Sequence, residues 1–365
     1  MASANPVQLV RIARLRRFVG IFARGGDRSA TAQALGELAS AGRAAGLTTE
    51  ALRRAREAAA LLADSDDHEA GSRALLHLAS LCLETGAPDA AVSAADLARE
   101  RAELAEGAVR EELITGAMLV AGIAHGSQGE DEAARELLAE ARDRLVAAGQ
   151  PAGAALALVQ QGLLDVADEV PEGADLCFAY ARDFYRVAQL PLAAVEVAGV
   201  AARAYAETGP WPQAQRWYTT AIGEADTLGA HALAAELVSD LAHELEEIDQ
   251  NAEALRHATD AARRCADLGD DADELKMRVR LQLARLAEDP REALRHVESV
   301  FELALARREP TALGAALEVV VSGIVKERFA PGTWRLVEKL RDHLRAAGFD
   351  VLAGTMDTAL ADLRK

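Results

Sequence analysis

Aromatic residues are scarce in this sequence, and that scarcity constrains the fold. Only 4% of the 365 residues are Phe, Trp or Tyr, and alanine dominates the 50% that is hydrophobic. A core built mainly from alanine brings backbones close together, which suits thin layers of helix on helix and excludes a thick β-sandwich. Ten prolines are few for an all-β chain of this size, and β-branched runs bounded by turn residues are nearly absent. We therefore expect an all-α fold.

Cysteine is also rare, with three residues that are far apart. Cys82, Cys177 and Cys265 each lie inside an apolar helical pattern, and their number is odd. We interpret them as small core side chains in a reducing compartment rather than as disulfide partners or metal ligands. The eight histidines show no spacing typical of metal ligands. We predict neither a metal nor a cofactor.

Long apolar runs are missing. No stretch of about 18 uncharged apolar residues occurs, so no segment is predicted to span a membrane. The N-terminus also lacks the uninterrupted apolar run of a secretory signal. We expect a cytoplasmic protein. Lysine occurs only four times while arginine and alanine abound, a bias typical of GC-rich bacterial genomes.

The net charge of −18 is distributed unevenly along the chain. Residues 1–28 carry +5, residues 324–345 carry +3 and the last twenty carry −1, which leaves −25 for residues 29–323. A body this acidic repels phosphate backbones, so nucleic acid is excluded as its partner. The simplest interpretation of the acid is solubility of a long exposed surface.

A pair of small residues seven positions apart recurs along the chain. The first member of each pair moves forward by 40, 43, 40, 40 and 40 residues, and weaker copies follow at Ala293 and Thr333. A fixed period of this length is typical of stacked supersecondary repeats. The six clear pairs are Ala51/Ala58, Ala91/Ala98, Ala134/Ala141, Ala174/Ala181, Ala214/Ala221 and Ala254/Ala261.

Each repeat is predicted to be two helices joined by a short turn. The stretch YAETGPWPQAQRWYTTA, residues 205–221, has Gly209 where a left-handed residue closes a first helix, and Pro212 where proline fits the start of a second. The period predicts such turns near 46–50, 86–88, 129–130, 168–171, 209–212, 249–251, 288–290 and 329–332.

These residues resemble the tetratricopeptide repeat family. Its pattern is similar to Ala201, Ala202, Tyr205, Gly209, Ala214, Tyr218 and Ala221, and again to Leu78, Ala79, Cys82, Gly86, Ala91 and Ala98. The period of 40 exceeds the usual length of about 34, and the large residue early in the first helix is mostly missing. Forms with a period near 40 occur in bacterial regulatory and scaffold arrays of this family.

The resemblance implies a right-handed α-solenoid of antiparallel helix pairs. We expect three regions: a basic amphipathic N-terminal helix over residues 1–28, an array of about eight helix pairs over residues 29–348, and a C-terminal capping helix over residues 349–365.

Motifs of enzymes are absent, including metalloprotease, phosphate-loop and serine-hydrolase signatures. The glycine-rich GIAHGSQGE, residues 122–130, falls at the end of a first helix, where packing and a helix stop explain its glycines. The acidic HELEEID, residues 243–249, has the composition of a cation site but is interpreted as a solvated helix end. We predict that the protein is not an enzyme.

First helices line the concave face of such arrays, and the repeat register assigns side chains to it. The apolar ones among them either pack on their neighbours or form a groove for an amphipathic helix with basic flanks. The carboxylate clamp of chaperone-binding members is missing. The predicted partner-binding residues are Arg73, His77, Leu119, Ile123, Val159, Gln160, Leu163, Glu196, Arg203, Asp240 and His243.

The N-terminal segment Val7–Gly26 is a second candidate site. Its apolar face includes Phe18 and Phe22, and Arg11 and Arg14 intrude on it. Three interpretations remain open: a cap docked on the first repeat, a helix on a membrane surface, or an arm that binds a partner or a second copy. The acidic body favours the arm over the membrane, because anionic lipid would repel the rest of the chain.

Together these observations favour a non-enzymatic scaffold or adaptor that binds a partner protein or helix through the concave groove. The alternative is a ligand- or peptide-sensing regulatory domain that acts on an effector in another chain. The expected partners are proteins, among them a basic or amphipathic helix, and a second copy through the N-terminal arm.

Overall fold

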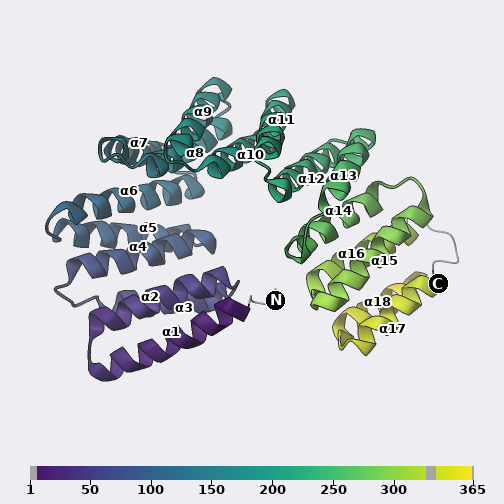
Figure 1. The fold of residues 1–365 in the computed structure, drawn as a ribbon, viewed down its shortest axis with the longest axis horizontal. Helices are drawn as coiled ribbons and strands as arrows, with labels where there is room; N and C mark the ends of the chain where they lie inside the picture. The colour runs from purple at the N-terminus through teal and green to yellow at the C-terminus, as the bar shows by residue number, and fades with distance from the viewer. Residues whose placement is uncertain (1–5, 326–333, 364–365) are drawn as a thin grey trace. The chain divides into compact units, whose positions relative to one another are not determined.

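The computed structural model describes residues 6–325 and 334–363, and within these ranges every regular element is a helix (Figure 1). The elements are α1 (Pro6–Gly25), α2 (Arg28–Ala44), α3 (Thr48–Leu61), α4 (His68–Glu84), α5 (Pro88–Glu103), α6 (Ala108–Gln128), α7 (Asp131–Ala147), α8 (Pro151–Ala167), α9 (Pro171–Val187), α10 (Pro191–Thr208), α11 (Trp211–Thr227), α12 (His231–Glu247), α13 (Asn251–Cys265), the 3₁₀ turn η1 (Asp270–Ala272), α14 (Asp273–Leu286), α15 (Pro290–Arg307), α16 (Pro310–Val325), α17 (Trp334–Ala346) and α18 (Asp350–Leu363). None of the described helices is long and apolar enough to cross a membrane.

Seven of the eight predicted turns are confirmed. The connection α10–α11, for example, leaves only Gly209 and Pro210 between two long helices. Proline stands in the first turn of α5, α9, α11 and α15, where its missing N–H removes no helical hydrogen bond. The eighth predicted turn, at 329–332, lies outside the described residues.

The turns share one backbone conformation even where glycine is absent. Gly129 and Gly209 have φ values of 77° and 99°, as a left-handed residue after a helix requires. The equivalent residues Glu169 and Asp249 have φ values of 58° and 62°. In these two repeats a bond from the N–H of the next residue, Val170 or Gln250, to a carbonyl in the last helical turn measures 2.8 Å. The closing hydrogen bonds therefore hold the turn without glycine.

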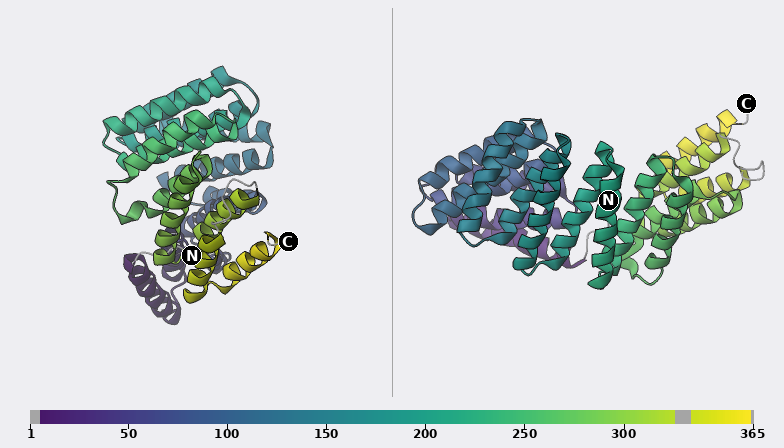
Figure 2. Two further views of the ribbon diagram at one scale, coloured as in Figure 1. Left: turned by 90° about the vertical axis from the view of Figure 1, so that its right-hand side faces the viewer. Right: turned by 90° about the horizontal axis from the view of Figure 1, so that it is seen from above.

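The chain forms two compact units, and their boundary falls inside α10, between Val197 and Ala198. In unit 1, which extends to Val197, the first helices of the repeats α2, α4, α6 and α8 contact one another in sequence. The second helices α3, α5 and α7 each pack against the two first helices beside them, and α9 packs on α8 (Figures 1 and 2). We call these the A helices and the B helices.

Unit 2, which begins at Ala198, repeats this arrangement. The A helices α12, α14 and α16 contact one another, and the B helices α13 and α15 each pack against two of them. One core cluster joins α14, α15, α16, α17 and α18 and includes Phe301 and Leu313. Tyr205 and Tyr218 are also fully buried in this unit.

The repeating alanines stand where A and B helices meet. Both members of all six pairs are buried, and Ala293 of the weaker copy is buried as well. The register inferred from the sequence is therefore correct. Cys82 and Cys265 are buried, as expected of core side chains, whereas Cys177 is half-buried and its thiol lies 3.8 Å from Oδ2 of Asp165. Burial raises the pKa of Cys177 to about 11.

Candidate functional site

The N-terminal helix α1 lies against the first repeat. Ile12 and Leu15 are buried against Leu38 and Ala41 of α2 and Ala45 just after it. Phe18 and Val19 are partly buried at the edge of this contact. The apolar face that the sequence predicted for this helix is therefore largely occupied within the chain.

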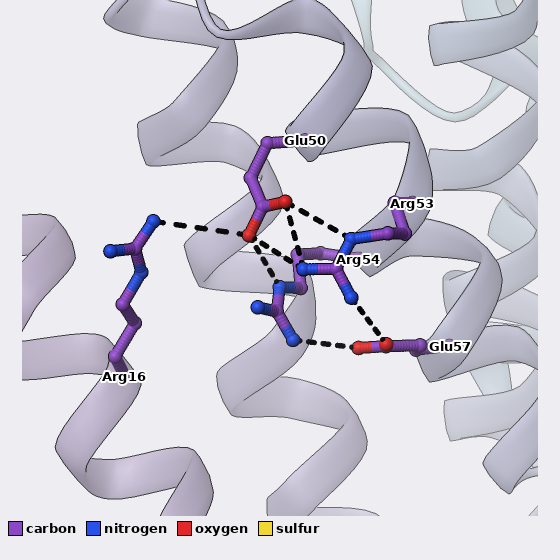
Figure 3. Close-up of polar contacts among 5 residues, drawn as sticks. All are labelled: Arg16, Glu50, Arg53, Arg54 and Glu57. Atoms are coloured by element: carbon purple, nitrogen blue, oxygen red, sulfur yellow. Dashed lines mark hydrogen bonds and ion pairs between the residues drawn. The ribbon is translucent and has the colours of Figure 1, made fainter.

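A polar network joins α1 to α3 (Figure 3). Oε1 of Glu50 lies 3.9 Å from Nη2 of Arg16 on α1 and accepts a 2.9 Å hydrogen bond from Nε of Arg54. Arg53 and Arg54 also each donate a 2.9 Å hydrogen bond to Glu57. The hydrogen bond from Arg53 is the largest cause that lowers the pKa of Glu50. Because Arg16 is largely exposed, its pair adds orientation rather than much stability.

The other side of α1 remains exposed and basic. Arg11 and Arg14 are exposed, and the guanidinium of Arg14 lies 5.4 Å from the ring centroid of Phe18. Phe18 stacks on Phe22 with ring centroids 6.2 Å apart, and both rings are half-buried. Ile21 is exposed as well. This surface is available to a partner, whereas the face with Ile12 and Leu15 is not.

The predicted groove residues of α4 are held by polar contacts to neighbouring A helices. Arg73 is exposed, and its guanidinium lies 3.2 Å from Glu69 and 3.5 Å from Glu112 of α6. Nε2 of His77 lies 3.3 Å from Oγ of Ser40 on α2. Burial lowers the pKa of His77, and the nearby Arg43 adds to this shift.

The predicted residues of α6 and α8 form a partly covered apolar surface. Leu119, Ile123 and Leu163 are half-buried, and Gln160 lies among them with its side chain half exposed. Leu119 and Ile123 pack against the core that Leu138 and Leu164 belong to. Val159 is buried, so its side chain is not exposed to a partner as the sequence had predicted. The interpretation as core packing therefore applies to Leu119 and Ile123, and the groove for a partner helix stays a prediction.

In unit 2 the structure brings charged residues of three A helices together. Nη1 of Arg203 on α10 lies 3.0 Å from Oδ2 of Asp240 on α12. The second oxygen of Asp240 lies 3.4 Å from Arg278 of α14, which also approaches Glu236 at 3.7 Å. Asp240 is largely covered, whereas Arg203 and Arg278 are about half exposed. Glu196 in unit 1 and His243 in unit 2 are exposed.

Two contributors to these surfaces were missed at the sequence level. Arg278 completes the charged row, and Leu156 of α8 is an exposed apolar side chain beside the predicted row. The repeat period could have identified Leu156, because Leu76, Gly116 and Leu156 occupy the same position in successive repeats. Leu76 lies next to Gly116, since a methyl group on that glycine would contact its side chain. Arg278 falls after the repeat loses its strict spacing, so the period alone does not place it.

A buried phenol lies near the acidic end of α12. The hydroxyl of Tyr218 is buried and has no hydrogen-bond partner in the described structure. Burial raises its pKa, and Glu244 and Asp240 add to the shift. The pKa of Glu244 is itself raised, mainly by burial. HELEEID therefore includes two half-buried acids, Glu244 and Glu246. No group of three or more His, Cys, Asp or Glu in the described residues is arranged to hold a metal ion.

The glycines of GIAHGSQGE serve packing. A methyl group placed on Gly122 would lie 2.9 Å from Cγ of Leu138, and one on Gly126 would contact Ala134 and Leu164. Gly129 closes α6 in the left-handed conformation. The interpretation of this stretch as helix packing and a helix stop is confirmed.

No protein-family model matches the chain, and no curated protein sequence matches it. Solved structures do. A signal transduction ATPase with numerous domains and a tetratricopeptide repeat sensor, from Pyrococcus horikoshii, matches 97% of this chain with a TM-score of 0.53 and 12% identity. Aspartyl phosphate phosphatase F from Bacillus subtilis matches 66% of the chain with a TM-score of 0.47 and 13% identity. The quorum sensor NprR from B. thuringiensis, in its apo form, matches 94% with a TM-score of 0.44 and 13% identity.

The match extends over different shares of these proteins. It covers 55% of the ATPase chain, 61% of the phosphatase chain and 100% of the NprR chain. The chain thus spans less than two thirds of the first two. At these identities the likeness concerns the fold. The resemblance to tetratricopeptide repeat proteins is confirmed at that level: the chain is an all-α solenoid of stacked helix pairs, similar in fold to part of the ATPase chain.

Proposed function

We propose that this protein is a non-enzymatic adaptor that binds a protein segment on the A helices of unit 1. The observation that carries the proposal is the apolar surface of α6 and α8, where Leu119, Ile123 and Leu163 are half-buried and Leu156 is 37% exposed. These side chains already pack at their base, so they form a preordered surface rather than loose chain. An A-helix surface of this kind suits the apolar face of an amphipathic helix.

The charges around this surface favour a partner with basic flanks. Glu112 of α6 and Glu196 of α10 are exposed on A helices of the same unit, and the central part of the chain carries −25. Such a field accelerates the approach of a basic segment and opposes an acidic one. We place the protein in the bacterial cytoplasm, in line with its composition and its few cysteines.

Site-specific photocrosslinking tests this proposal. A photoreactive phenylalanine analogue is introduced at Leu156 or at Leu97, a more exposed leucine on the B helix α5. We expect one defined protein adduct in the native host from position 156 and none from position 97. The Leu163→Glu change should then weaken binding of that purified partner by at least roughly tenfold. Equal adducts at both positions would contradict the assignment.

A sensing role is the second candidate, and it is supported by unit 2. A cavity of about 490 Å³ lies between α12 and α14, and its lining includes Glu236 and Arg278 of the charged row together with the apolar Leu268 and Leu275. A cavity of this size with a few charged groups suits a small molecule or a peptide end. Native mass spectrometry of the protein purified from its host would reveal such a ligand as a fixed added mass. The Arg278→Ala variant should lose that mass.

We further propose three regions for the chain. Residues 1–28 form an arm whose basic outer surface contacts a partner or a second copy, residues 29–348 form the repeat array, and residues 349–365 form a capping helix. The packing of Ala353 and Met356 of α18 into the core of unit 2 supports the cap. The exposed Arg11 and Arg14 support the arm.

A further inference from the structure

One face of α9 carries a stripe of apolar side chains that are more than half exposed in the described structure. Leu176, Tyr180 and Val187 are 58%, 57% and 68% exposed. Their spacing of four and seven residues places them on one side of the helix. Phe178 and Ala181, on the opposite side, are fully buried. The stripe thus adds nothing to the core of unit 1.

Other repeats show that the fold does not require this stripe. At the positions 40 residues earlier α7 has Glu136, Glu140 and Ala147, and at those 40 residues later α11 has Arg216, Thr220 and Thr227. Two exposed leucines, Leu97 on α5 and Leu104 directly after it, occur without an aromatic residue. Contiguous exposed apolar surface is typical of an interaction site rather than of a monomer surface.

Exposed apolar residues also stand at both ends of α9. Val170 precedes the helix, Leu190 follows it, and Leu192 lies at the start of α10. All three are about half exposed.

We propose that a second copy of this chain docks on α9, with the two α9 helices antiparallel about a two-fold axis. Leu176 and Val187 are equally distant from the point midway between Ala181 and Arg182, and so are Tyr180 and Asp183. Antiparallel pairing about that point sets Leu176 of one copy against Val187 of the other. It also sets the phenol of Tyr180, as donor, against the carboxylate of Asp183. The same contacts occur twice, as a two-fold interface requires.

The charges of α9 fit this orientation. Its amino-terminal half carries Glu172 and Asp175, and its carboxyl-terminal half carries Arg182 and Arg186 together with Asp183, so the two halves have formal charges of −2 and +1. In an antiparallel pair the acidic half of each helix faces the basic half of the other, whereas a parallel pair would set like charges together. Charge therefore selects the antiparallel pair, and the apolar stripe supplies the area.

The size of the contact predicts a reversible dimer. One helix from each copy, with the apolar residues at its ends, buries less than the roughly 1,200 Å² that stable interfaces exceed. We expect monomer and dimer to exchange, with a dissociation constant of about 1 μM or higher. The proposed binding surface on the A helices is not used by this contact, so the two proposals stand or fall separately.

Sedimentation velocity of the full chain over a concentration series tests the proposal. We expect a monomer–dimer equilibrium for the wild type. In the dimer, the Tyr180→Asp change sets the new carboxylate of each copy against Asp183 of the other. This repulsion occurs twice and should weaken dimerisation by at least roughly tenfold. Thr220→Asp adds the same charge at the equivalent position of α11 and should leave the equilibrium unchanged. Circular dichroism verifies that both variants are folded.

A mixing experiment distinguishes the two-fold pair from other contacts. One chain carries Tyr180→Asp and the other carries Asp183→Arg. In their dimer the two introduced charges, at positions 180 and 183, attract each other, and the remaining Asp183 faces the remaining Tyr180. This heterodimer should form where Tyr180→Asp alone remains monomeric. A wild type that is monomeric at several hundred micromolar would overturn the proposal. A dimer that persists in both the Tyr180→Asp and the Asp183→Arg variant would also overturn it. The same holds if the α9 surface binds a different protein and no second copy.

Discussion

At the scale of single residues, two helices can pack closely where one of them has a glycine and therefore no side chain at the contact. Gly162 of α8 faces the ring of Phe178 on α9, and a methyl group at this position would lie 2.9 Å from Cε1 of that ring. Gly223 of α11, in contrast, has no atom within 4 Å of where its methyl group would be. One glycine is required by packing, and the other only weakens its helix.

These two glycines give a matched prediction. Gly162→Ala should lower the free energy of unfolding by about 1–3 kcal/mol, because the fully buried Phe178 ring has little room to move. Gly223→Ala should raise it by roughly 0.5–1 kcal/mol through helix propensity. Urea denaturation of both variants measures the difference. Equal effects of the same sign would show that α8 and α9 do not pack as closely as described.

Glu244 gives a prediction that depends on pH. Its pKa is raised, chiefly by burial, while Glu207 and Asp240 add to the shift and His243 opposes it. The folded protein therefore binds this proton more tightly than the unfolded chain, and its stability falls as pH rises through the raised pKa. Glu244→Gln should consequently stabilise the protein at pH 7.

The gain from Glu244→Gln should shrink as pH falls and vanish below about pH 4.3, where the carboxyl is protonated in both states. Thermal unfolding at several pH values measures it. Glu132→Gln, an exposed change on α7 away from Glu244, is the control and should have little effect at any of these pH values. A stabilisation by Glu244→Gln that does not change with pH would contradict the linkage.

At the scale of elements, the helix pairs were predictable because each is encoded locally. Alanine pairs mark the contact, and Gly129 or Pro212 marks the turn. The turns at Glu169 and Asp249 have no glycine, and only the period locates them in the sequence. They form without glycine because hydrogen bonds to the preceding helix fix the backbone. A repeat thus conveys more about fold than any single motif in it.

Surfaces were less predictable than helices. The period identifies which side of an A helix a residue is on, and so it assigned Arg203 and Asp240 to the same face. In the structure these two residues lie 3.0 Å apart. It does not fix depth, and Val159 is buried one position before the half-exposed Gln160. The stripe on α9 was also missed, because Leu176 and Tyr180 look like ordinary core residues until the buried side of the helix is known.

The helix α1 gives a prediction for a whole element. Leu15 is buried against α2, so Leu15→Ala should lower the free energy of unfolding by about 2–4 kcal/mol. Arg17→Ala, an exposed change on the same helix, should stay within about 0.5 kcal/mol of the wild type. Urea denaturation compares them.

Removal of residues 1–26 separates a cap from an arm. We expect the remaining helices to stay folded by circular dichroism, and the oligomeric state in light scattering or the capture of a partner to change. Loss of the helical signal on truncation would make α1 a cap only. If folding, mass and partner binding were all unchanged, the proposed arm would have no function.

At the scale of the whole molecule, charge is the dominant long-range feature. The chain carries −18 at neutral pH, with −25 in residues 29–323. Many of the ion pairs link exposed groups, such as Arg43 with Glu84 and Arg53 with Glu57, and such pairs contribute little to stability. Repulsion among the unbalanced carboxylates acts over longer distances and favours the unfolded, expanded chain.

Salt should therefore stabilise this protein at pH 7. Raising NaCl from 10 to 100 mM shortens the screening length from about 30 Å to about 10 Å, which weakens repulsion between distant carboxylates more than attraction within close pairs. We expect the Tm in calorimetry to rise by a few degrees. Near pH 5.0, the isoelectric point of the sequence, net repulsion is absent and the same salt step should leave the Tm unchanged or lower it. A Tm that falls with salt at pH 7 would mean that the ion pairs between helices outweigh the repulsion, and that the acidic surface is part of what holds the array together.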